Sequence, residues 1–160
     1  MANRLDVLCE ARQVRKMITT FPVHPSPSMV SSFERQLRAG EVEVELIPQG
    51  TFTERMRVAG AGLGGFYTPT GAGTIVENGK EKRVFGGKEY LLELPLRADF
   101  ALLKAHKSDP HGNLVYRGSA RNFNPVMDTA ADTVIVEVDE IVAPGELDPA
   151  ALGLGRSLEG

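Results

Sequence analysis

A strand that runs directly into a helix, within residues 42–73, limits the possible folds of this chain more than any other segment. The segment reads VEVELIPQGTFTERMRVAGAGLGGFYTPTGAG. Val42, Val44 and Leu46 alternate with glutamates, and this period of two predicts a strand with one buried face. Pro48 has no amide hydrogen to give to a strand ladder, so the strand should end before it. The sequence therefore predicts a strand, a Pro-Gln-Gly corner and a helix in direct succession.

Both ends of that helix have sequence signals. Thr51 and Glu54 have the T-x-x-E spacing of a capping box, which predicts the helix N-terminus. Gly60 follows the last residue that we expect to be helical, and a glycine there can adopt the left-handed C′ conformation. We therefore expect the helix to occupy the residues between these two signals.

The corner before the helix is a candidate ligand site. Open α/β sheets bind ligands at the carboxyl ends of their strands, and a helix N-terminus favours an anion. Gln49 would contribute a neutral amide donor there, and Gly50 would let a ligand or another backbone come close. The spacing alone also fits an ordinary strand-to-helix turn in which Gln49 faces water.

A glycine-rich loop follows the helix. The glycines of residues 60–65 do not form a dinucleotide fingerprint, because that motif follows a strand and opens a helix. A Walker loop is excluded as well, because the chain has no Gly-Lys-Ser/Thr sequence. We expect a loop that lines a pocket or contacts a neighbouring subunit. Thr68, Thr70, Gly71 and Gly73 would bring hydroxyl and amide donors near a ligand, although a tight connection with positive φ fits them equally.

The remaining pattern predicts an α/β fold in one domain, residues 1–160. Helices and strands alternate, which favours a mainly parallel sheet. Turn signals at Asn78-Gly79 and Gly86-Gly87 predict antiparallel strands within residues 74–94. The apolar run at residues 100–104 predicts a strand covered on both faces. The other predicted elements are a capped helix after Ser31 that Gly40 closes, a helix from Pro125 to Ala131, and a strand at residues 133–138.

Composition excludes several classes of function. The net charge of −3 gives no indication of a nucleic-acid partner. The only cysteine, Cys9, excludes a disulfide framework and a zinc cluster, and we expect no bound metal. No apolar run approaches the roughly 18 residues of a membrane span, and no signal peptide is recognisable, so we expect no membrane contact and a cytoplasmic location. His24 should be a solvated loop residue and His111 a turn residue.

The segment ELIPQGTFTERMRVAGAGLGGFYTPTGAGT resembles the α-subunit of the family I CoA-transferases, which include the succinyl-CoA:3-oxoacid and 3-oxoadipate enzymes. The resemblance extends over residues 12–150, in order, through QVRKMI, FERQLRAGEVEVEL, DFALLKAHKSDPHGNLVYRGSARNFNPVM and VDEIV. It implies a three-layer α/β/α fold. A resemblance of this length is far more specific than a single glycine motif.

The resemblance also implies a mechanism. In these enzymes a glutamate that belongs to the β-subunit forms a mixed anhydride with the acyl group of an acyl-CoA and then a glutamyl-CoA thioester, from which a second acid takes CoA. The α-subunit glutamine of the Pro-Gln-Gly corner, here Gln49, contributes to the oxyanion hole. The implied substrate is a CoA thioester, with no tightly bound cofactor, and the implied partner is the β-subunit in a heterodimer or heterotetramer. Glu77-Asn78-Gly79 resembles the motif of the nucleophile, but its surroundings resemble an α-subunit hairpin, so we interpret Glu77 as a turn residue.

The chain departs from the family at its front end, where a complete α-subunit has a glycine-rich GGFG-type turn. We expect either a fragment or a naturally shortened form, also shortened at the C-terminus. A missing first strand would leave a sheet edge and a core face bare, so the isolated chain should tend to associate. Two alternative functions remain open at this point: a catalytically inert binding module with the same fold, and a sugar-phosphate isomerase on a related scaffold.

Overall fold

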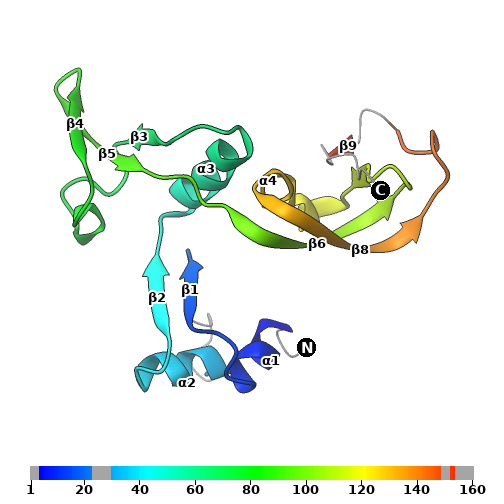
Figure 1. The fold of residues 1–160 in the computed structure, drawn as a ribbon, viewed down its shortest axis with the longest axis horizontal. Helices are drawn as coiled ribbons and strands as arrows, with labels where there is room; N and C mark the ends of the chain where they lie inside the picture. Colours follow the sequence, from blue (N-terminus) through cyan, green and yellow to red (C-terminus); the bar gives the residue numbers. More distant parts are fainter. Residues whose placement is uncertain (1–3, 23–29, 149–151, 154–160) are drawn as a thin grey trace. The chain divides into compact units, whose positions relative to one another are not determined.

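The computed structural model describes residues 4–22, 30–148 and 152–153, and the chain divides into two compact units, residues 1–52 and 53–160 (Figure 1). His24 lies outside the described residues. The boundary between the units falls within one helix, and no sheet or core cluster crosses it among the described residues. That the whole chain is a single domain stays a prediction.

Unit 1 is a small α/β unit built on one pair of parallel strands (Figure 1). The pairing joins Lys16 to Glu43 at one end and Thr19 to Leu46 at the other. Its core consists of Cys9, Phe33 and Val42, all buried. The elements of unit 1 are α1 (Arg4–Glu10), β1 (Lys16–Thr19), α2 (Ser32–Arg38) and β2 (Glu43–Leu46).

The capping residues predicted for α2 are confirmed. The Ser31 hydroxyl accepts a hydrogen bond from the Glu34 amide at 3.1 Å, and the Glu34 carboxylate accepts one from the Ser31 amide at 2.9 Å. Gly40 closes the helix with a φ of +71°, and the Glu41 amide bonds back to the Gln36 carbonyl at 2.9 Å. This is the reciprocal capping that satisfies the otherwise unpaired groups of a helix end.

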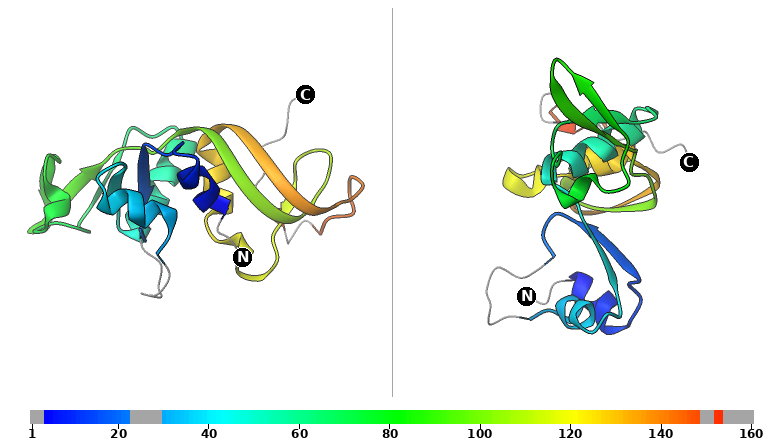
Figure 2. Two further views of the ribbon diagram at one scale, coloured as in Figure 1. Left: turned by 90° about the horizontal axis from the view of Figure 1, so that it is seen from below. Right: turned by 90° about the vertical axis from the view of Figure 1, so that its left-hand side faces the viewer.

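Unit 2 contains two sheets (Figures 1 and 2). The first is antiparallel, in the order β3-β5-β4, and the second has the order β8-β6-β7-β9, in which only β6 and β8 are parallel. The strands are β3 (Phe66–Thr68), β4 (Lys82–Phe85), β5 (Lys88–Glu93), β6 (Ala98–Ser108), β7 (Leu114–Val115), β8 (Ala131–Ile141) and β9 (Leu152–Gly153). The helices are α3 (Gln49–Gly60), whose first residues belong to unit 1, α4 (Asn124–Thr129), and the 3₁₀ turns η1 (Ile75–Glu77) and η2 (Gly118–Arg121). Parallel pairs and antiparallel strands together with helices confirm the α/β fold class.

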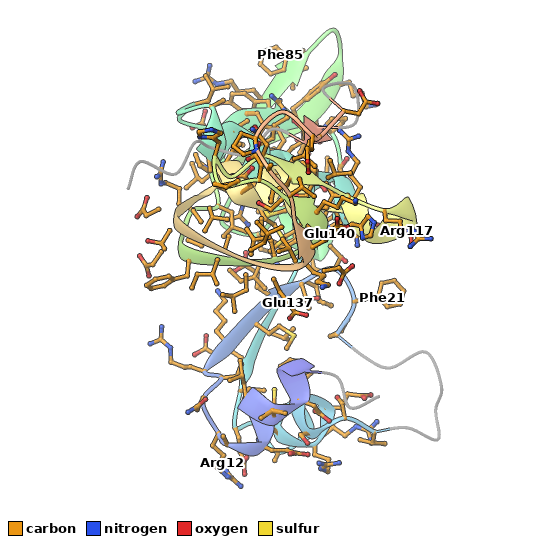
Figure 3. All side chains as sticks on the ribbon, turned by 90° about the vertical axis from the view of Figure 1, so that its right-hand side faces the viewer. Arg12, Phe21, Phe85, Arg117, Glu137 and Glu140 are labelled. Carbon is orange, nitrogen blue, oxygen red and sulfur yellow. The ribbon has the colours of Figure 1, made fainter. Side chains whose placement is uncertain are left out.

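The long parallel pair β6/β8 is covered on one face only within the described residues. Ala101, Leu103 and Ala105 are buried in the core of unit 2, whereas Phe100 and Leu102 are 63% and 68% exposed. The expectation that residues 100–104 are covered on both faces is therefore wrong for this structure. Alternate residues of a strand point to opposite faces, and here only one face has a packing layer. Charged side chains continue the exposed face, among them Glu137, labelled in Figure 3, whose carboxylate lies 3.4 Å from Lys104 Nζ.

The antiparallel strands expected in residues 74–94 form only in part. Gly86-Gly87 joins β4 to β5 as predicted, with both glycines at positive φ, and Phe85, labelled in Figure 3, precedes that turn. Asn78-Gly79 does not join two strands, because η1 precedes it. Asn78 has φ −59° and ψ 124°, and Gly79 has φ +76°, which is a type II turn rather than the type I′ turn of a hairpin.

Candidate functional site

The corner between β2 and α3 confirms the predicted strand, proline and helix. The Ile47 amide extends the parallel ladder by donating to the Thr19 carbonyl at 3.0 Å. Pro48 then ends the strand, and the Phe52 amide donates to the Pro48 carbonyl at 2.9 Å. The helix consequently begins at Gln49, the residue that the sequence assigned to this corner.

The predicted capping box at this helix is wrong. Because α3 begins three residues earlier than expected, at Gln49 instead of Phe52, Thr51 is its third residue instead of its cap. The Thr51 hydroxyl is buried and has no hydrogen-bond partner in the described part of the chain. Glu54 pairs with Arg57, at 2.6 Å, one turn further along the helix. The proline carbonyl, rather than a side chain, accepts the first helical hydrogen bond.

The C-terminal signal at Gly60 is also displaced. Gly62 has the positive φ, +70°, and the Leu63 amide bonds to the Val58 carbonyl at 2.9 Å, which places C′ two residues beyond the prediction. Gly60 is the last residue of the helix, and a Cβ on it would approach Thr129 Oγ1 to 2.3 Å. Gly60 is therefore required by the close packing of α3 against Thr129, and not by the helix end.

Gln49 and Gly50 are both exposed at the start of α3. The helix supplies no acceptor to the amides of its first turn, and its dipole is positive at this end, so the corner favours a developing negative charge. A Cβ placed on Gly50 would meet no described atom within 4 Å, and Gly50 does not have a positive φ. Neither local packing nor backbone conformation in the described residues accounts for a glycine at this position.

The four residues predicted to bind substrate in unit 2 lie on one loop, residues 68–73, which we call the 68–73 loop. Thr68 Oγ1 accepts a hydrogen bond from the Thr70 amide at 3.2 Å, and the Thr70 side chain is exposed. Gly71 and Gly73 have φ values of +88° and +77°. Both predicted features, the hydroxyl-bearing loop and the positive φ of its glycines, are present together.

A carboxylate that the sequence assigned only to a turn holds the end of this loop. Glu77 is the last residue of η1, which confirms the turn, and its Oε2 accepts a hydrogen bond from the Gly73 amide at 2.6 Å. Its Oε1 lies 2.6 Å from Lys82 Nζ. The Lys82 ammonium and then the Gly73 amide lower the pKa of the Glu77 carboxyl below its ordinary value.

A second carboxylate, also missed by sequence reasoning, lies in β5. The Glu93 side chain is only 3% exposed, and its Oε1 lies 2.5 Å from Lys80 Nζ. Glu93 pairs with Phe66 in the β3/β5 ladder, so the ion pair links the segment after Gly79 to the strand before the 68–73 loop. The acidic and basic residues of the segment ENGKEK indicate that ion pairs form here, but the sequence does not specify which charged side chains pair.

The predicted site residues thus form two groups, Gln49 with Gly50 in unit 1 and the 68–73 loop in unit 2. In unit 1, a hollow of ≈ 540 Å³ is lined by residues 13–18, and another of ≈ 420 Å³ is lined by residues of α1 and α2 and of the segments that follow them. Gln49 lines neither hollow. His111 is a turn residue, as predicted, since its amide donates to Asp109 Oδ1 at 3.0 Å.

The described residues contain no group of three or more His, Cys, Asp or Glu that could hold a metal ion. Within the same ranges, no helix has the length and apolar character needed to cross a membrane.

Comparison with known proteins identifies the family. The family model described as coenzyme A transferase matches residues 3–153. The chain is 52% identical over 145 residues to the A subunit of the 3-oxoadipate CoA-transferase of Pseudomonas putida, covering 91% of this chain and 62% of that protein. It is 48% identical over 150 residues to the A subunit of the succinyl-CoA:3-ketoacid coenzyme A transferase of Helicobacter pylori strain J99, covering 94% and 62%. The chain therefore spans less than two thirds of the length of these relatives.

Among solved structures, glutaconate coenzyme A-transferase from Acidaminococcus fermentans has the same fold, with a TM-score of 0.79 over 94% of this chain and 55% of that one, at 18% identity. The family match extends over nearly the whole chain and includes the β2–α3 corner and the 68–73 loop. The chain belongs to the coenzyme A transferase family.

Proposed function

We propose that this chain is the A-subunit part of a CoA-transferase that moves CoA from an acyl-CoA, such as succinyl-CoA, to a 3-oxo acid. The relatives that support this are named as A subunits of 3-oxoadipate and succinyl-CoA:3-ketoacid transferases. An A subunit implies a B subunit, and we propose that the two assemble as a heterodimer or heterotetramer. The buried, unpaired Cys9 fits the reducing cytoplasm that we propose as the location.

In the proposed reaction the nucleophile is a glutamate of the B subunit. Its carboxylate adds to the thioester carbonyl, and CoA leaves as the thiolate, which gives a mixed anhydride. The thiolate then attacks the glutamyl carbonyl and releases the donor acid, which gives glutamyl-CoA. The acceptor acid reverses this sequence and leaves with CoA. Every step places negative charge on a carbonyl oxygen, and the enzyme must stabilise that charge.

The observation that carries the proposal is the position of Gln49 as the first residue of α3. Its carboxamide is a neutral donor on an exposed corner where the helix dipole already favours negative charge. Gly50, where a Cβ would meet no described atom, leaves room for a substrate or a partner backbone. We assign Gln49 to oxyanion stabilisation and the 68–73 loop, with Thr68, Thr70, Gly71 and Gly73, to binding of the CoA thioester.

Gln49→Ala tests this assignment in the enzyme assembled with its B subunit. With succinyl-CoA as donor and 3-oxoadipate or acetoacetate as acceptor, we expect kcat to fall about 10²–10³-fold while KM changes little, because the lost donor acts in the transition state. Gln13→Ala, which removes another exposed carboxamide of unit 1, should leave both constants near those of the wild type. Unchanged single-turnover formation of the glutamyl-CoA thioester in Gln49→Ala would remove Gln49 from the mechanism.

Assays of the wild-type chain, alone and mixed with its B subunit, distinguish this function from other functions on the same fold. CoA exchange that appears only when both subunits are present supports the transferase. Acyl-CoA binding without exchange would contradict it and indicate an inert binding module. Sugar-phosphate isomerisation by this chain alone would contradict it too.

A further inference from the structure

The backbone of the 68–73 loop adopts a conformation that other groups must stabilise. Gly71 and Gly73 both lie in the left-handed region, and glycine loses more conformational freedom on ordering than any other residue. At its start the loop has local contacts: the Thr70 amide donates to Thr68 Oγ1 at 3.2 Å, and the Ala72 amide donates to the Pro69 carbonyl at 3.3 Å. The other end of the loop, at Gly73, is held by a group outside the loop.

At that other end, the carboxylate of Glu77 uses both oxygens. Oε2 accepts the Gly73 amide at 2.6 Å, and Oε1 lies 2.6 Å from Lys82 Nζ. Lys82 is the first residue of β4, so the carboxylate connects the loop to the three-stranded sheet. Hydrogen bonds that involve an ionised group are about twice as strong as neutral ones. The Glu77 side chain is 23% exposed, so solvent screens this connection only in part.

Val76 reinforces the same geometry from within η1. A Cβ on Gly71 would come within 2.8 Å of Val76 Cγ1, so Gly71 packs directly on the residue before Glu77. The Thr74 hydroxyl adds a third contact by donating to the Gly71 carbonyl at 2.7 Å. The loop and η1 therefore form one folded piece that the Glu77 carboxylate joins to β4.

We propose that Glu77 is a positioning residue, which holds the 68–73 loop through the Gly73 amide, with Lys82 as counterion, in the shape that binds the CoA thioester. The binding role of the loop rests on the proposed function. The Glu-Asn-Gly sequence could instead indicate a nucleophile, but a nucleophilic carboxylate must have an oxygen directed at the substrate. Here both oxygens already have partners within the chain.

Amide exchange in the 160-residue chain tests the holding role without any substrate. In Glu77→Ala the Gly73 amide loses its acceptor, and we expect its exchange to quicken about tenfold relative to wild type. Glu77→Gln keeps an acceptor but loses the charge and should give an intermediate rate. Glu89→Ala is the matched control, because it removes the other carboxylate near Lys82, at 3.3 Å, and leaves the Gly73 contact intact. An unchanged Gly73 exchange rate in a folded Glu77→Ala chain would overturn the proposal.

Kinetics with the B subunit test the link to substrate. Glu77→Ala should raise the KM for succinyl-CoA about tenfold with kcat within a factor of about two, since the loop binds ground state and transition state alike. Glu77→Gln should recover part of the affinity, and Glu89→Ala should resemble wild type. This pattern is opposite to that expected for Gln49→Ala. Loss of single-turnover thioester formation in Glu77→Gln, with KM unchanged, would contradict positioning and indicate a nucleophile.

The amide-exchange experiment and the kinetic experiment can contradict the two proposals independently. If the wild-type mixture shows no CoA exchange, the proposed function is wrong, whereas Gly73 exchange still decides whether Glu77 holds the loop. If Gly73 exchange quickens in Glu77→Ala while succinyl-CoA affinity stays the same, the loop is held but does not bind substrate, and the positioning role is wrong.

Discussion

At the scale of single residues, the structure gives different roles to side chains that have the same sequence pattern. Thr51 and Ser31 both begin a capping-box pattern, but only Ser31 is a cap. The difference arises from Pro48, whose carbonyl accepts the Phe52 amide and moves the helix start back to Gln49. Thr51 consequently lies within the helix at a buried position, where its hydroxyl lacks a hydrogen-bond partner among the described residues.

That buried hydroxyl leads to a prediction for stability. Thr51→Val replaces the unpartnered hydroxyl with a methyl group of similar shape, and the two residues have nearly the same helix propensity. We expect the free energy of unfolding, measured by urea denaturation, to rise by about 1 kcal/mol, because the desolvation cost of the hydroxyl disappears. A lower free energy of unfolding in Thr51→Val would show that the hydroxyl has a partner in solution.

At the scale of elements, glycines determine where α3 ends and how it packs. Gly62 provides the left-handed residue at C′, and Gly60 allows the helix to approach Thr129. In the sequence, a run of glycines indicates that a helix ends nearby, but it does not indicate which glycine occupies C′. The choice depends on Thr129, which is distant in the sequence and close in space.

The glycine assignment predicts how alanine substitutions differ. Gly62→Ala forces an alanine into the left-handed region and should lower the unfolding free energy by about 1–2 kcal/mol. Gly64→Ala is the matched control, because Gly64 does not have a positive φ and a Cβ there meets no described atom within 4 Å. Gly64→Ala should therefore be nearly neutral in the same thermal or urea denaturation. Equal effects of the two substitutions would contradict the C′ assignment.

At the scale of the whole molecule, the stability of unit 2 depends on pH through carboxylates at η1, after β6 and in β8. Lys82 lowers the pKa of Glu77, the Asn113 side-chain amide lowers that of Asp109, and Lys104 lowers that of Asp139. A carboxyl whose pKa is lower in the folded state stabilises the fold above its unfolded pKa. That stabilisation is lost as the pH falls through the folded pKa.

We therefore expect the unfolding free energy to be nearly constant near neutral pH and to fall below about pH 4, the ordinary range of these carboxyls. The measurement is a set of urea denaturation curves between neutral pH and pH 3. Asp109→Asn, which removes one of the three carboxyls, should lower stability at neutral pH and make the loss in acid shallower. Parallel pH profiles for Asp109→Asn and wild type would refute a contribution from Asp109.

The sequence by itself determined the succession of strand, proline and helix at the Pro-Gln-Gly corner with Gln49 at its centre, the capped helix after Ser31, the Gly86-Gly87 hairpin and the family. These features depend on local backbone chemistry or on a long ordered resemblance. Only the tertiary structure decided that Glu77 holds Gly73, that Lys80 pairs with Glu93, that Gly60 packs on Thr129, and that Phe100 and Leu102 stay exposed. The last two depend on which segments meet in space. The carboxylate contacts depend on the turn conformations between the groups, and a charge pattern along the chain does not specify them.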